Sequence, residues 1–153
     1  MARGTPSPAD EGTSASIAII PAKLVEALRE GVYGELRAVA EEVVETTQTP
    51  GHSLYPMRYQ EHRERFNAAC ALLDAIGWAA TPATAELQVN LLAHRTVLLA
   101  ALVGAREDAA DALGDVTEGR QTDPDKRRLI AERAQDLREL AAAVEAQAAG
   151  LEC

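Results

Sequence analysis

The sequence concentrates basic and aromatic side chains in one short segment, at the start of an expected helix. Tyr55, Arg58, Tyr59, His62 and Arg65 all lie in it. Arg58, His62 and Arg65 are spaced by three or four residues, so they share one face of a helix. Because the arginine guanidinium matches carboxylate and phosphate groups, this face is a candidate site for an anionic ligand.

The same segment has a simpler interpretation as a solvated helix face. Glu61 and Glu64 are interleaved with the basic residues, and Glu61 stands four positions before Arg65. Side chains at this spacing are neighbours on a helix surface and form weakly stabilising ion pairs. The sequence alone therefore supports both an anion site and an ordinary charged surface.

His94 and Arg95 interrupt a nearly apolar stretch, residues 91–103. Arginine is almost never fully buried without a partner. Arg95 is therefore expected either to pair with a carboxylate from another helix or to line a polar pocket for an anionic ligand. His94 is expected to be a core histidine that bonds to a neighbouring carbonyl or carboxylate. The candidate partners of Arg95 by helix face are Glu41, Glu42 and Glu64.

Residues suited to metal binding or covalent catalysis are present, but not in the usual patterns. A site built from His52, His62 and His94 is conceivable, yet no zinc spacing and no Glu-x-x-His pattern occurs. Neither a Gly-x-Ser-x-Gly turn nor a glycine-rich phosphate loop is found. Cys70 and Cys153 are expected to be free thiols, Cys70 being inert in an apolar helix. We therefore predict no metal, no cofactor and no catalytic residue.

The composition excludes several classes of protein. Of the 153 residues, 31 are Ala, and only 3% are aromatic. Ala is the best helix former, whereas aromatic and β-branched residues favour strands, so an all-β fold is excluded. The formal net charge of −9 opposes nonspecific binding to nucleic acid or to an anionic membrane. We therefore expect neither nucleic acid nor membrane as a partner.

The segment 71–88 is loosely compatible with a helix-turn-helix DNA reader. Its connection is longer than the usual roughly three to four residues. Its second helix would begin at Pro82 and would contain no Arg, Lys or Gln before Gln88. A DNA-binding regulator is therefore the less favoured alternative.

Hydrophobic periodicity and capping residues predict four helices. They span about residues 21–47, 53–76, 82–113 and 124–151, with Thr81 as the cap of the third and Asp123 as the cap of the fourth. Gly77 is placed to end the second helix. Gly31 and Gly34 share a face of the first helix, which predicts either the close approach of another helix or a kink.

Short loops between long helices make neighbouring helices antiparallel. We therefore predict an all-α protein, an antiparallel up-and-down four-helix bundle with a flexible N-terminal tail. The tail comprises residues 1–16, and a single helical domain comprises residues 17–153. Residues 17–20 are expected to form a short extended arm that docks on the domain. The absence of a signal sequence and of a membrane-length apolar run predicts a cytoplasmic location.

The fourth predicted helix carries an apolar residue at every seventh position, namely Ile130, Leu137, Val144 and Leu151. Together with the nearly all-apolar third helix, this repeat predicts a homodimer formed through helix faces. The favoured function is a non-enzymatic helical interaction or structural protein that self-associates. The alternative is a small-ligand-binding or catalytic bundle that uses the Arg and His cluster.

Overall fold

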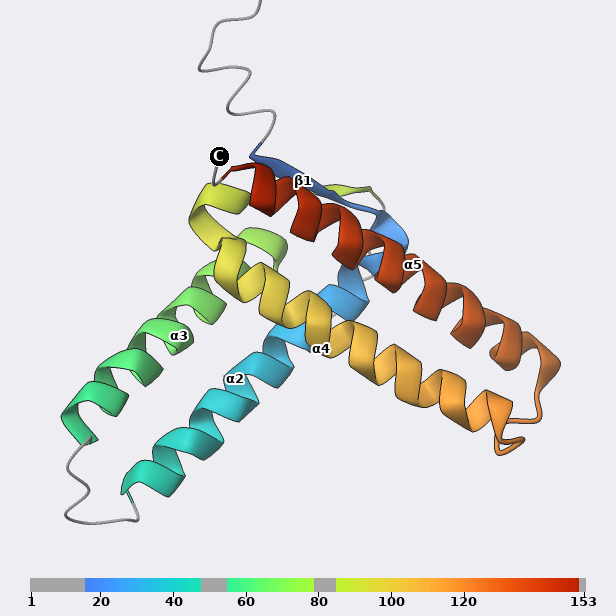
Figure 1. Ribbon diagram of the computed structural model, residues 1–153, viewed down its shortest axis with the longest axis horizontal. Helices are drawn as coiled ribbons and strands as arrows, with labels where there is room; N and C mark the ends of the chain where they lie inside the picture. Colours follow the sequence, from blue (N-terminus) through green and yellow to red (C-terminus); the bar gives the residue numbers. More distant parts are fainter. Residues whose placement is uncertain (1–15, 48–54, 79–84, 152–153) are drawn as a thin grey trace, which may run out of the picture.

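The computed structural model describes residues 16–47, 55–78 and 85–151, with side chains at all of these positions except 45–47 and 55–59. Four long helices make up most of the chain: α2 (Val25–Thr47), α3 (Tyr55–Ile76), α4 (Leu91–Thr117) and α5 (Pro124–Gly150). A short 3-10 helix, η1 (Ala22–Leu24), precedes α2, and two short strands complete the described structure (Figure 1). The predicted all-α fold with four helices is confirmed.

The two strands form an antiparallel ribbon. β1 (Ile17–Ile20) pairs with β2 (Leu87–Asn90), with Ala18 opposite Val89. Alternate side chains of the ribbon, those of Ala18, Ile20 and Val89, enter the core. The expected extended arm at residues 17–20 is therefore confirmed. The tail was predicted to include Ser16, but Ser16 is buried and its carbonyl accepts a hydrogen bond from the Leu91 amide at 2.6 Å; residues 1–15 lie outside the described part.

The start of the third long helix was predicted wrongly. Residues 87–90 form β2, and α4 begins only at Leu91, where the Asn90 side chain accepts hydrogen bonds from the amides of Leu92 and Ala93. Pairing with β1 holds this segment extended, so tertiary structure overrides the local helix signals. The expected cap at Thr81 lies outside the described residues. The helix-turn-helix interpretation fails for the same reason, because its second helix would include the residues of β2.

Arg29 on α2 links this helix to the C-terminal end of α3. The residue is only 4% exposed. Its guanidinium pairs with Glu26 and donates a hydrogen bond from Nε to the carbonyl oxygen of Gly77 at 2.9 Å. Gly77 has φ of +95°, as predicted for the residue that ends the helix. The next residue, Trp78, is held by Tyr33, whose hydroxyl donates to the Trp78 carbonyl at 2.6 Å. These bonds satisfy backbone carbonyls at the end of α3, which the helix itself leaves unpaired.

The helices form two antiparallel hairpins, α2–α3 and α4–α5, which meet beside the ribbon and diverge away from it (Figure 1). The central helix is α4, which packs against α5, α2 and, over a shorter length, α3. In the described part of the chain, neither α2 nor α3 has an extended contact with α5. Two of the apolar residues at every seventh position of α5 pack inside the single chain, since Leu137 and Val144 belong to the core.

The two hairpins are joined by a close crossing of α2 over α4. A Cβ atom added at Gly31 would lie 2.3 Å from the carbonyl oxygen of Ala101. Only glycine therefore fits at this position, which confirms the predicted close approach. At Gly34, one turn further along, an added Cβ would have no neighbour within 4 Å. The close approach is thus confined to Gly31.

The crossing predicts opposite effects of the same substitution at the two glycines. Gly31→Ala should lower the free energy of unfolding by at least about 2 kcal/mol, because the clash is with backbone and requires the helices to separate. Gly34→Ala should raise it by about 0.5–1 kcal/mol, because Ala is the better helix former and space is available. Urea unfolding followed by circular dichroism measures both. Equal effects at the two positions would contradict the described crossing.

Candidate functional site

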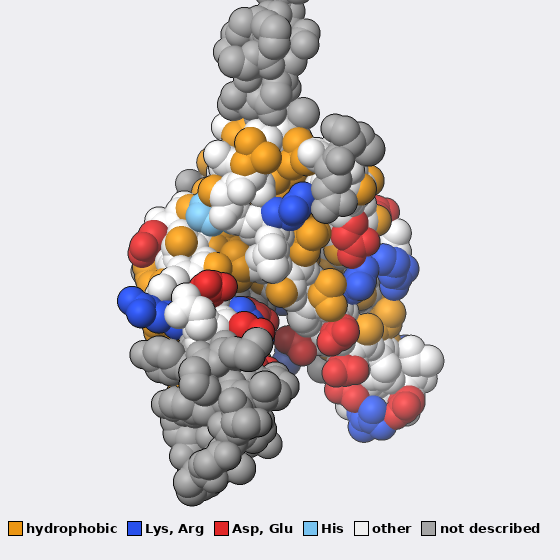
Figure 2. Space-filling model, turned by 60° about the vertical axis from the view of Figure 1, so that its left-hand side comes forward, with side chains coloured by type: hydrophobic (Ala, Val, Ile, Leu, Met, Phe, Trp, Pro, Cys, Tyr) orange, Lys and Arg blue, Asp and Glu red, His pale blue; other side chains and the backbone are white. Residues whose placement is uncertain are grey.

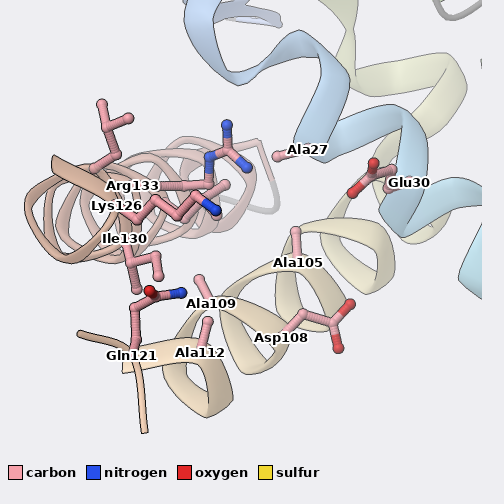
Figure 3. Close-up of a pocket in the computed structure, with 12 residues that line it drawn as sticks. Ala27, Glu30, Ala105, Asp108, Ala109, Ala112, Gln121, Lys126, Ile130 and Arg133 are labelled. Carbon is pink, nitrogen blue, oxygen red and sulfur yellow. The ribbon is translucent and has the colours of Figure 1, made fainter. Parts of the chain in front are cut away.

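A hollow lies between α2, α4 and α5, where the two hairpins begin to diverge (Figure 3). We call it the interhairpin groove; its volume is about 390 Å³. In Figure 2, several acidic side chains gather around the middle of the lower half of the molecule. The groove is lined by Ala27, Glu30, Ala105, Asp108, Ala109, Ala112, Gln121, Lys126, Leu129, Ile130, Arg133 and Leu137.

The floor of the groove is made largely by alanines. Ala105, Ala109 and Ala112 follow one another along α4 at helical spacing, and Ala27 faces them from α2 (Figure 3). Methyl side chains are too short to fill the space between helices that diverge, so the hollow remains open. A residue of larger volume stands at its edge: Leu129 is 58% exposed, although it is a large apolar side chain.

The two walls of the groove carry opposite charges. Glu30 on α2 and Asp108 on α4 lie on one side, and Lys126 and Arg133 on α5 lie on the other (Figure 3). Within the part of the chain that the structure describes, none of these four side chains forms an ion pair within 4.0 Å. The groove therefore combines an apolar floor with an acidic wall and a basic wall.

The predicted ligand cluster on α3 is engaged with α2. Arg65 donates from Nη1 to Glu42 at 2.6 Å and from Nη2 to Glu35 at 2.8 Å. The His62 side chain is buried, and its Nε2 lies 3.2 Å from the same Glu42 carboxylate. The hydrogen bonds that Arg65 donates to Glu35, together with the nearby carboxylate charges, raise the pKa of Arg65. The expected partner on its own helix, Glu61, is thus replaced by two partners on the neighbouring helix.

The other residues of that cluster are placed only in part. Tyr55, Arg58 and Tyr59 lie in the first turns of α3, and their side chains lie outside the described ones. The structure thus brings together His62 and Arg65 of the five predicted residues. Their guanidinium and imidazole groups face carboxylates of this chain, so the geometry there is that of a structural ion-pair network between two helices.

His94 and Arg95 lie apart from this network, in the second turn of α4. Both are partly buried and line a smaller hollow of about 290 Å³ with Ala68 of α3 and Leu151. Neither His62 nor Arg65 lines this hollow. Of the four predicted ligand residues whose side chains are described, His62 and Arg65 therefore lie in one place and His94 and Arg95 in another. The sequence predicted that His94 is a core histidine, but in the structure it is only partly buried.

Among the residues that the structure describes, no group of three or more His, Cys, Asp or Glu side chains is arranged to hold a metal ion. No described helix is both long and apolar enough to cross a membrane.

Comparisons with known protein families, with curated proteins and with solved structures find no match. The sequence analysis missed the interhairpin groove, although one signal for it was present. Successive positions of α4 that face the groove carry Ala at 105, 109 and 112, where a tightly packed bundle usually carries larger residues.

The ion-pair network predicts a measurable role for Arg65 in stability. Arg65→Met should lower the free energy of unfolding by about 1 kcal/mol, because Glu35 is mostly buried and loses its partner. Arg120 also contacts two carboxylates, Asp115 and Glu118, but all three side chains are well exposed. Arg120→Met should therefore cause no measurable loss. Urea unfolding at low salt compares the two variants, and equal losses would contradict a special role of the network.

The environment of Cys70 predicts that its thiol reacts slowly with alkylating reagents. Burial, and secondarily the Asp74 carboxylate, raises the pKa of Cys70. In a Cys153→Ser variant, the alkylation of Cys70 by iodoacetamide should therefore be slower than that of glutathione at neutral pH and should reach half its maximum at higher pH. Because the raised pKa belongs to the folded state, ionisation at alkaline pH should also reduce stability. Reaction as fast as that of glutathione would disprove this assignment.

Proposed function

We propose that this chain is a non-enzymatic helical interaction protein that self-associates as a homodimer. The observation that carries the proposal is the interhairpin groove. It combines an apolar floor, an exposed leucine at its edge and four charged side chains without ion pairs within 4.0 Å in the described structure. Exposed apolar surface rimmed by polar groups is typical of a protein–protein contact.

The single chain itself buries part of the faces that the sequence suggested for a dimer. Leu137 and Leu102 are each only 1% exposed, and both belong to the core of the single chain. Leu137 and Val144 of the seven-residue repeat therefore pack inside the chain, whereas Ile130 is only partly buried and lines the groove. The apolar surface that remains open lies in the groove and at the scattered exposed positions Ile19, Val44, Phe66, Trp78, Leu92 and Leu129.

The alternative, an anion-binding or catalytic bundle, has less support. The guanidinium of Arg65 already binds two carboxylates of the same chain, so an anionic ligand would have to displace them. His94 and Arg95 line a different hollow, which does not include the α3 residues. A catalytic constellation requires its groups to converge on one point, and these groups do not.

The proposal predicts a concentration-dependent mass. In sedimentation or light scattering, the full chain should pass from its monomer mass of 16.3 kDa towards twice that value between about 1 and 100 μM. Measurements at low and at roughly physiological salt are needed, because each chain carries a net charge of −9 and salt screens the repulsion. A monomer mass at every concentration and both salt levels would overturn the proposal.

A further inference from the structure

We propose that the dimer forms by closure of the interhairpin groove of one copy on the same groove of a second copy. The inference rests on the proposed self-association and adds the surface and its symmetry. It commits to a second copy of this chain as the occupant, because the groove carries the charge pattern that a self-complementary contact needs.

The charges of the two walls determine whether the groove can face its own copy. In a two-fold dimer each surface meets an identical surface, so every contact occurs twice. A groove with two walls of the same charge would repel its copy. Here Glu30 and Asp108 form an acidic wall and Lys126 and Arg133 form a basic wall. A two-fold axis that runs along the groove places the acidic wall of each copy over the basic wall of the other.

The state of these charges in the single chain supports the same arrangement. The four charged wall residues are exposed. Their side chains form no ion pair within 4.0 Å with other described residues. They are therefore available to pair between copies without first breaking bonds. Charges at the rim of an interface contribute mainly to the choice and the orientation of the partner.

Leu129 supplies the apolar part of the contact. It lies on the basic wall, is 58% exposed, and stands beside a floor of alanines that leaves space for a larger side chain. When the two grooves face each other, the Leu129 side chain of one copy is directed towards the floor of the other. Apolar burial of this kind favours association in proportion to the apolar area removed from water.

The test exchanges the charges of the two walls in separate chains. The acidic-wall variant carries Glu30→Lys and Asp108→Lys, and the basic-wall variant carries Lys126→Glu and Arg133→Glu. Each variant alone should be monomeric at concentrations where the original chain is a dimer, because like charges now meet. An equimolar mixture should recover the dimer mass in sedimentation velocity, because both contacts between the two chains then join opposite charges.

The mixture separates contacts between chains from contacts within one chain. If the walls only attracted each other across their own groove, each variant would keep its like-charged walls after mixing, and no dimer would return. The acidic-wall variant is the stricter control for net charge. It is less negative than the original chain, so the loss of its dimer cannot come from general repulsion.

A second comparison tests the apolar contact. Leu129→Glu should reduce dimer affinity at least tenfold, whereas Leu92→Glu should not change it, although Leu92 is 72% exposed and lies outside the groove. Both variants should keep the helical circular dichroism spectrum. If the original chain is a dimer but the wall mixture stays monomeric, or Leu129→Glu has no effect, the groove is not the interface and the proposed self-association stands. If the original chain is a monomer throughout, both proposals fail.

Discussion

The close crossing of α2 over α4 determines the shape of the whole protein. At Gly31 the two helix backbones approach so closely that no side chain fits between them. One point of contact fixes the two helices there, but it does not force them to run side by side beyond it. The hairpins α2–α3 and α4–α5 can therefore diverge, and the groove exists because α2 and α5 have no extended contact in the described structure.

Near the ribbon the two hairpins are tied together by specific bonds. The ribbon joins the segment before α2 to the segment before α4. Within the first hairpin, Arg29 of α2 binds the carbonyl oxygens of Gly77 and Ile76 at the end of α3. Lys23, just before α2, pairs with Asp136 of α5 at 2.9 Å. Away from the ribbon these ties are absent from the described residues, and alanine takes the place of larger side chains on α4. The chain is thus well connected at one end and open at the other.

Features that depend on neighbouring residues in the sequence were predicted correctly, whereas features that depend on contacts between distant segments were not. The ends of helices at Gly77 and Asp123 were predicted correctly, because a left-handed residue and a capping side chain act within one turn. The strand at residues 87–90 was missed, because it depends on pairing with a segment about seventy residues earlier. The partners of Arg65 were wrong for the same reason, since carboxylates on another helix replaced Glu61. The groove could not be located, because spacing along one helix does not show where two helices separate.

The position of β1 also bears on the order in which the chain can fold. This strand is close to the N-terminus, yet it pairs with residues 87–90, and the carbonyl oxygen of Ile17 accepts a hydrogen bond from Gln147 near the end of α5. The α2–α3 hairpin consists of local contacts and can form while the rest of the chain is still being synthesised. The strand cannot form its native contacts until residues 87–90 and the end of α5 have emerged from the ribosome. Until then its apolar residues Ala18 and Ile20 remain exposed to solvent. The first residues of the folded domain are therefore among the last to reach their native contacts.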